Sequence, residues 1–146
     1  MNKKEFINYL NEIFRSFGFK KNGNNWYMET QFLRKIISLQ KSNYGNYYYI
    51  NYGWILKNLD LPGSYHIGGR LASIDKDENN RIDSLLNLDK DIENRRLELY
   101  NIIVPELIEK LQLINTEDDM LEYIKSLTPP LSKMVPGIVK KHFNLL

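Results

Sequence analysis

The fold is decided by residues 32–56, which read FLRKIISLQKSNYGNYYYINYGWIL. Two runs within it, residues 32–42 and 47–56, alternate apolar and polar side chains and are rich in β-branched and aromatic residues. This is typical of strands that bury one face. The linking residues, Asn43-Tyr44-Gly45-Asn46, have the composition of a turn. We therefore predict two antiparallel strands joined as a hairpin.

The register of this hairpin determines which side chains share a face. Pairing Ser42 with Tyr47 across the turn places the polar residues of both strands on one side, namely Ser38, Gln40, Tyr49 and Asn51. The other side is apolar and carries Ile37, Leu39, Tyr48, Ile50, Tyr52 and Trp54. Neutral hydrogen-bonding side chains on a rigid sheet can hold a ligand, a partner protein or another part of the fold. The polar side is therefore a candidate site.

Before this hairpin the sequence predicts a helix and a shorter hairpin. Apolar residues recur at helical spacing over residues 3–17, and Gly18 supplies a C-terminal stop. Residues 19–22 and 26–30 then flank a turn formed by Gly23-Asn24-Asn25. These residues tolerate the positive φ that a tight turn requires.

After the central hairpin we expect a fifth strand over residues 65–72. Its adjacent glycines, Gly68 and Gly69, would let another backbone or a ligand approach closely. A long helix follows around residues 97–111, and Pro105 should bend or split it. Thr116 resembles the N-cap of another helix, which runs to Leu127.

The order of these elements predicts an α+β fold with an N-terminal helix, an antiparallel sheet of about five strands and C-terminal helices packed on the sheet. At 146 residues the chain is long enough for one domain with a real core. We place that domain at residues 1–128. Residues 129–146 then form a basic tail, which either docks as a short helix or frays.

Composition limits the classes of function. The chain has no cysteine, so it has no disulfide framework, no thiolate nucleophile and no cysteine-based zinc site. It has no apolar signal stretch at its start and no run of 18 apolar residues. We therefore expect a cytoplasmic protein without a membrane anchor.

Charge is unevenly distributed along the chain. Residues 1–70 hold ten Lys and Arg against four Asp and Glu, whereas residues 71–146 hold ten against fourteen. The simpler interpretation is a basic sheet region packed near an acidic helical region. The alternative is a basic surface that attracts nucleic acid or an acidic protein.

Motifs of known catalytic chemistry are missing. The only two histidines, His66 and His142, lack a second donor at metal-ligand spacing, and no HExxH, GxSxG, phosphate-loop or GxGxxG pattern occurs. The acidic residues between positions 75 and 93 are best explained as a solvated surface. We therefore predict no catalytic residue, no cofactor and no metal site.

The best candidate site combines the polar side of the hairpin with the fifth strand. If that strand joins the sheet with its polar side aligned, the ligand- or partner-binding residues are Ser38, Gln40, Asn51, His66 and Arg70. His66 and Arg70 could bind an anion. Two structural roles compete with this hypothesis. In one, which we favour, Arg70 forms an ion pair with an acidic residue of the C-terminal helices; in the other, those helices cover a buried hydrogen-bond network.

Four segments together resemble a bacterial family catalogued as domain of unknown function 4304. They are FGFKKNGNNWY at residues 17–27, ISLQKS at 37–42 with the following Tyr44-Gly45, YINYG at 49–53 and HIGGRL at 66–71. The resemblance covers about residues 1–127 and implies an uncharacterised α+β domain with no assigned reaction. Tyr65 stands where the family often has a cysteine, so no thiol role is expected at this position.

We expect a non-enzymatic protein-interaction or binding module, and fold-level analogy points to an immunity or antitoxin-like role. The alternative is a small ligand-binding protein or enzyme that acts through His66 and Arg70, with Gln40 and Asn51 orienting a substrate. Nucleic-acid binding is a third and weaker hypothesis. Its support is the tyrosines of the turn region, on which bases could stack, but the RNP-type pattern is missing.

Overall fold

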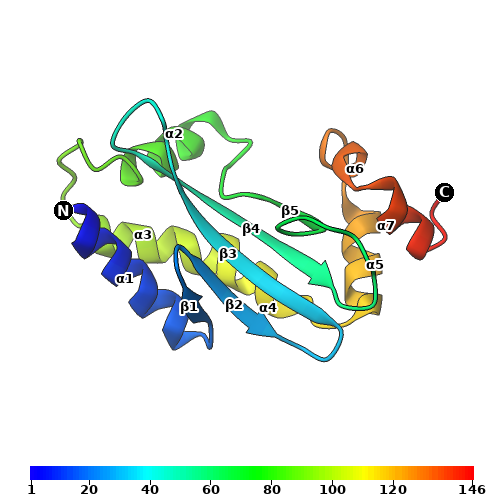
Figure 1. Ribbon diagram of the computed structural model, residues 1–146. Helices are drawn as coiled ribbons and strands as arrows, with labels where there is room; N and C mark the ends of the chain where they lie inside the picture. Colours follow the sequence, from blue (N-terminus) through cyan, green and yellow to red (C-terminus); the bar gives the residue numbers. More distant parts are fainter.

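The computed structural model describes all 146 residues. A first helix, α1 (Lys3–Ser16), precedes five strands: β1 (Lys20–Asn22), β2 (Asn25–Glu29), β3 (Leu33–Lys41), β4 (Tyr48–Leu56) and β5 (Ile67–Arg70). Six further helices follow: α2 (Lys76–Leu85), α3 (Arg95–Ile103), α4 (Glu109–Leu113), α5 (Glu117–Ser126), α6 (Leu131–Met134) and α7 (Gly137–His142). The chain thus has the predicted α+β organisation, with an N-terminal helix, five strands and C-terminal helices (Figure 1). None of these helices is both long and apolar enough to cross a membrane.

The five strands form one antiparallel sheet in the order β1-β2-β3-β4-β5. In the central pair Ser38 lies opposite Asn51 and Gln40 opposite Tyr49, which confirms the register predicted from the turn. The fifth strand is shorter than the expected residues 65–72, because only Ile67–Arg70 pair in register with β4. The His66 ring contacts the preceding loop instead.

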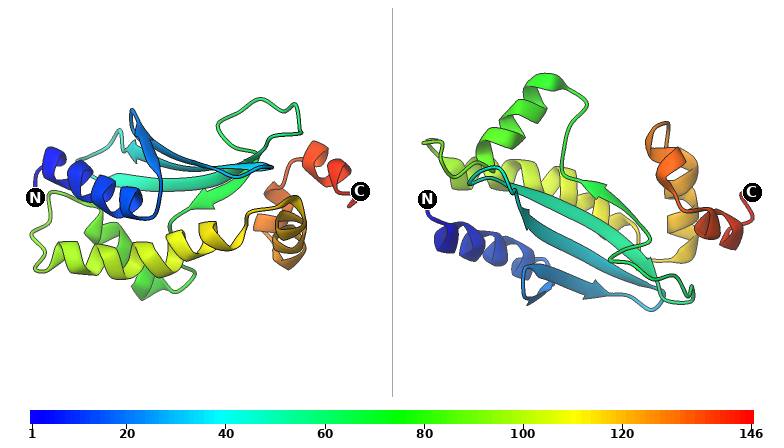
Figure 2. Two further views of the ribbon diagram at one scale, coloured as in Figure 1. Left: turned by 90° about the horizontal axis from the view of Figure 1, so that it is seen from below. Right: turned by 45° about the horizontal axis from the view of Figure 1, so that its top comes forward.

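Helices cover only one face of the sheet. Side chains of α1 pack on its apolar face: the Phe6 ring lies 5.2 Å from the Tyr48 ring, and the Phe14 ring lies 4.9 Å from Trp26. Helices α3 and α4 lie on the same side, behind the sheet in Figure 1 and below it in the left view of Figure 2. The opposite face, which we call the outer face, has no helix over it.

Pro105 changes the long helix without ending it. A π-helical turn, η1 (Val104–Ile108), connects α3 to α4, so the expected bend takes the form of a widened turn at the proline. Such a turn accommodates a residue that has no N–H to donate. Ile103 and Leu111 remain buried on the two sides of it.

The last three helices stand at the end of the sheet near β5 (Figures 1 and 2). Helix α5 begins with the predicted capping box, in which Thr116 and Asp119 satisfy each other's backbone N–H groups. The tail residues form α6 and α7, and Val135 and Val139 are buried in the same core as the sheet. His142 of α7 contacts the carboxylate of Glu117.

A buried lysine fixes the junction of α4 and α5 to the sheet. Lys35 of β3 is 1% exposed, and its Nζ donates a hydrogen bond to Asn115 Oδ1 at 2.5 Å. The Asn115 carbonyl accepts a second bond from the Thr30 hydroxyl at 2.9 Å. Burial holds the pKa of Lys35 below its usual value, because the charged form is poorly solvated there. The position of α5 therefore depends on β3.

Replacing this lysine should loosen that attachment. Lys35→Ala removes a packed aliphatic stem and leaves the Asn115 amide oxygen without its donor, so we expect the free energy of unfolding to fall by about 2–3 kcal/mol. Urea denaturation measures the change. Lys41→Ala, on the exposed end of the same strand, is the matched control and should stay within about 0.5 kcal/mol of the parent. Equal effects of the two substitutions would contradict the proposed role of Lys35.

Candidate functional site

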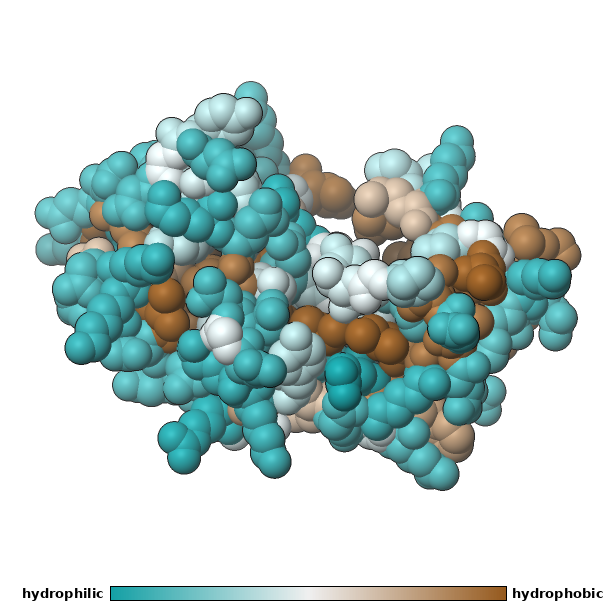
Figure 3. All heavy atoms as spheres, in the orientation of Figure 1, coloured by the Kyte–Doolittle hydropathy of each residue, from teal (hydrophilic) through white to brown (hydrophobic).

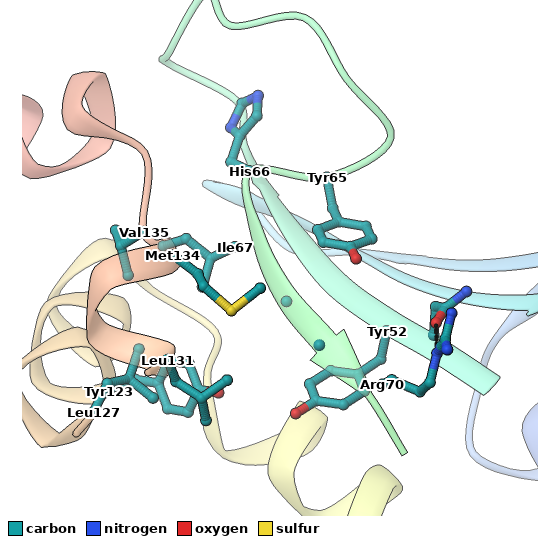
Figure 4. Close-up of a pocket in the computed structure, with 13 residues that line it drawn as sticks. Tyr52, Tyr65, His66, Ile67, Arg70, Tyr123, Leu127, Leu131, Met134 and Val135 are labelled. Carbon is teal, nitrogen blue, oxygen red and sulfur yellow. Dashed lines mark hydrogen bonds between the residues drawn. The ribbon is translucent and has the colours of Figure 1, made fainter. Parts of the chain in front are cut away.

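Three of the five candidate residues meet on the outer face. Asn51 Nδ2 donates to Gln40 Oε1 at 3.0 Å. Arg70 donates through Nε to Asn51 Oδ1 at 3.1 Å and through Nη2 to Gln40 Oε1 at 3.3 Å. The three side chains come from β3, β4 and β5: the register places Asn51 opposite Arg70, and Gln40 lies diagonally from them, opposite Tyr49. Figure 4 shows Arg70 on this side of β5. We call this group the Arg70 cluster.

An aromatic ring orders the Arg70 cluster further. The guanidinium carbon of Arg70 lies 3.9 Å from the centroid of the Tyr49 ring, which is a cation–π contact. Tyr47 packs edge-on against Tyr49, with 5.7 Å between the ring centroids. A hydrogen bond with the Tyr47 hydroxyl raises the pKa of Tyr49 above its usual value. The arginine is thus held by two amides and a ring.

Arg70 has no acidic partner, so the ion pair that we favoured from the sequence is wrong. Two cations of the first half of the chain, Arg34 and Lys57, both pair with Glu29, while the remaining ion pairs join residues of the second half. Ion pairs therefore form locally within each half and not between them. The positive charge of Arg70 is left uncompensated on an uncovered surface.

His66 does not join the Arg70 cluster. Its side chain is 4% exposed, and its Nδ1 accepts a hydrogen bond from the Leu56 N–H at 3.0 Å. Its Nε2 lies 2.7 Å from the Leu61 carbonyl oxygen, which fits a neutral ring that carries its proton on Nε2. Both ring nitrogens are thus engaged with backbone, and His66 holds the loop between β4 and β5. The predicted alternation does not place this side chain, because the strand begins at Ile67, two residues after the predicted start, and His66 lies before it.

Ser38 lies beside the Arg70 cluster and lines a shallow hollow. This hollow of about 410 Å³ is bounded by side chains of the outer face, chiefly Tyr27, Gln40, Asn51 and Tyr65. Figure 3 looks onto this face, where hydrophilic and intermediate side chains predominate. The sequence therefore predicted a polar face correctly, while the tyrosines that rim it from β2 and from the loop were missed.

Tyr65 occupies its place because two glycines face each other beneath it. Gly53 of β4 pairs with Gly68 of β5. A Cβ at Gly53 would lie 2.4 Å from Cγ of Tyr65, and one at Gly68 would lie 2.1 Å from the Tyr52 carbonyl oxygen. The close backbone approach expected at Gly68 is therefore made by β4. The Tyr65 ring covers the bare backbone of both strands.

A second hollow of about 400 Å³ runs along β5, between this strand and the C-terminal helices (Figure 4). Its strand side is formed by Ile67–Arg70, and its helix side by apolar residues of α5, α6 and their flanks, namely Tyr123, Leu127, Leu131, Met134 and Val135. Tyr52 lies at its base, and burial raises the pKa of the adjacent Tyr123 to about 12. We call this hollow the edge groove.

A methyl group between β4 and β5 should be poorly tolerated. We expect Gly53→Ala to lower the free energy of unfolding by about 1–3 kcal/mol, since it displaces Tyr65 and presses on the Ile67 carbonyl. Gly137→Ala is the matched control, because a Cβ there meets nothing within 4 Å, and it should leave stability unchanged or slightly increased. Thermal and urea unfolding compare the two variants. A Gly53→Ala protein as stable as the parent would contradict the close packing at this position.

Comparison with known proteins gives a family and nothing narrower. No curated protein and no solved structure matches the chain. The profile described as Domain of unknown function (DUF4304) matches residues 10–110, a range that holds the whole sheet and the entire Arg70 cluster. It covers well over half of the chain and agrees with the resemblance carried by the strand sequences. The chain belongs to the DUF4304 family.

Proposed function

We propose that this chain is a non-enzymatic module that binds another protein through its outer face. The observation that carries the proposal is an uncovered sheet face on which an arginine without an acidic partner is surrounded by tyrosines and amides. Tyrosine and arginine are enriched in the buried centres of protein interfaces and supply much of the binding energy there.

The order already present in the Arg70 cluster favours binding. Holding a long side chain in one conformation costs conformational entropy when a complex forms. The guanidinium is already restrained in the free protein by Asn51, Gln40 and Tyr49. Part of the entropy loss therefore occurs during folding and not during binding. Two guanidinium nitrogens already donate to amide oxygens, and the third, Nη1, has no such partner. A carboxylate of the partner would complete the site.

We also propose a cytoplasmic location and, as the specific role, an immunity or antitoxin-like protein. A chain without cysteine needs no oxidising compartment to fold, which suits the cytoplasm. Immunity proteins act by occupying a partner's surface, and an acidic partner matches the charge of Arg70. That specific role rests on fold-level analogy.

His66 and Arg70 both line the edge groove, but the contacts of His66 favour an enzyme acting through it less than they favour recognition. Both ring nitrogens of His66 already contact backbone groups, and the ring lies away from the Arg70 cluster. The cluster that remains holds a cation and two amides, which recognise an anion but include no general base. Recognition is therefore the activity that these side chains support best.

Charge reversal at Arg70 should weaken binding of the partner protein. A tagged form of the chain is used to capture proteins from extracts of the source organism, and the dissociation constant of the retained partner is then measured with purified protein. We expect Arg70→Glu to weaken binding by about thirtyfold or more, the loss typical of a central arginine. Asn51→Ala should weaken it less, because Gln40 still restrains the guanidinium.

Arg96→Glu is the matched control for this experiment. Arg96 is also exposed and also lies over a tyrosine ring, 5.1 Å from the centroid of Tyr9, but it belongs to α3 on the other side of the sheet. Binding by this variant should match the parent. Recovery of the same partner by the parent, Arg70→Glu and Asn51→Ala would rule out the outer face as the binding surface.

A further inference from the structure

The two edges of the sheet are protected to different degrees. Exposed edge strands present free backbone N–H and C=O groups, and proteins usually guard them with lysines, short length or a covering segment. At one edge, β1 has three exposed residues and carries Lys20 and Lys21. At the other edge, β5 carries Gly68 and Gly69, so this strand has neither a lysine nor a bulky side chain along its centre.

The pairing of β5 with β4 shows which of its backbone groups are free. The Leu71 N–H donates to the Ile50 carbonyl at 2.8 Å, and hydrogen-bonded residues alternate along an antiparallel pair. The backbone N–H and C=O groups of residues 67, 69 and 71 therefore point toward β4. The N–H and C=O groups of Gly68 and Arg70 point away from the sheet, toward the edge groove.

The edge groove lies along the free edge of β5. The helices α5 and α6 stand beside β5 without pairing to it, and the hollow between them measures about 400 Å³. Its helix wall exposes apolar surface to solvent, since Leu131 is 47% exposed and Met134 is 70% exposed. Figure 3 shows a notch between the C-terminal helices and the rest of the molecule. Figure 4 shows Met134, Leu131 and Tyr52 around the open space.

The two sides of an added strand would meet different chemistry. On the outer side, the next side chain along the sheet from Arg70 would lie beside its guanidinium, which has no carboxylate of its own. On the inner side, Gly69 has no side chain, so its backbone is bare next to Tyr52. A Cβ at this position would lie only 3.1 Å from the Tyr52 hydroxyl oxygen. An apolar side chain of the added strand could rest on this floor against Leu131 and Met134. Residues of a strand point alternately to these two sides.

We propose that the edge groove binds an extended, acidic segment of a partner protein, which adds to β5 as a sixth strand. The segment pairs its backbone with Gly68 and Arg70, places a carboxylate beside Arg70 and inserts a neighbouring apolar side chain between Gly69 and the wall of Leu131 and Met134. This inference rests on the proposed function and names the class of partner. Backbone pairing supplies affinity in such complexes, and side-chain pockets supply specificity.

A second copy of the chain is a poorer occupant of this groove. Its own β5 reads Ile-Gly-Gly-Arg and offers no carboxylate to Arg70. Pairing two β5 strands would instead bring two uncompensated arginines onto one sheet, where like charges oppose each other. Charge complementarity therefore favours a different chain with an acidic residue next to an apolar one.

The probe for this proposal is a displayed library of random linear peptides, selected on the whole protein. We expect enriched peptides to carry Asp or Glu adjacent to an apolar residue. N-methylation should abolish binding at alternate peptide positions only, because only alternate N–H groups face β5. When a selected peptide is added, the amide hydrogens of Gly68 and Arg70 should exchange more slowly, which NMR measures.

Variants of the helix wall separate this site from the outer face. Met134→Glu and Leu131→Glu should weaken a selected peptide by about tenfold or more, through charge repulsion and lost apolar contact. Leu97→Glu is the matched control, because Leu97 on α3 is 60% exposed, between Leu131 and Met134, and this variant should bind as the parent does. Circular dichroism checks that each variant remains folded.

Each outcome bears on one proposal or the other. Failure to select any peptide above background, insensitivity to Met134→Glu, or uniform tolerance of N-methylation would overturn the edge-groove inference. Elution of the free protein as a dimer that Met134→Glu dissociates would replace the partner segment with a second copy. If Arg70→Glu still removes the native partner while Met134→Glu retains it, the proposed function stands without the added strand.

Discussion

Strands β4 and β5 come closest where Gly53 faces Gly68, and both surfaces described above depend on this contact. A side chain at either position would collide with Tyr65 or with the Tyr52 carbonyl. Without side chains there, β5 stays paired to β4, Arg70 lies opposite Asn51, and Tyr65 covers the exposed backbone. The same absence of side chains leaves Gly69 bare on the inner side. The glycines therefore shape the outer face and the edge groove together.

Arg70 is the residue that these two surfaces share. Its guanidinium lies on the outer face among Asn51, Gln40 and Tyr49, while its backbone N–H and C=O belong to the free edge of β5. A segment bound at the edge would therefore lie beside the same charge that a partner on the outer face would neutralise. Because one cation serves both surfaces, a partner that used both, as proposed, would bury only one charge of this chain.

The sequence predicted the sheet better than it predicted the site. Strand pairing follows from local rules, because the turn at residues 43–46 and the alternation of side chains determine the register. The orientation of His66 does not follow from them, since its two partners, Leu56 and Leu61, lie outside the strand. The partner of Arg70 was also mispredicted, because total charge over each half of the chain says nothing about which charges meet. Whether helices cover a polar face likewise depends on tertiary packing and not on alternation.

The boundaries of the family match divide the candidate site into one part inside the matched region and one part outside it. Residues 10–110 include all five strands, so Gln40, Asn51 and Arg70 lie inside the matched region. The wall of the edge groove, from Tyr123 to Val135, lies beyond it. The Arg70 cluster and the free edge of β5 are thus built from the part of the chain that defines the family. The apolar wall is built from residues that the match does not reach. The proposed recognition of an anion therefore falls on residues inside the matched region, while the proposed choice of a neighbouring apolar residue falls on the C-terminal helices outside it.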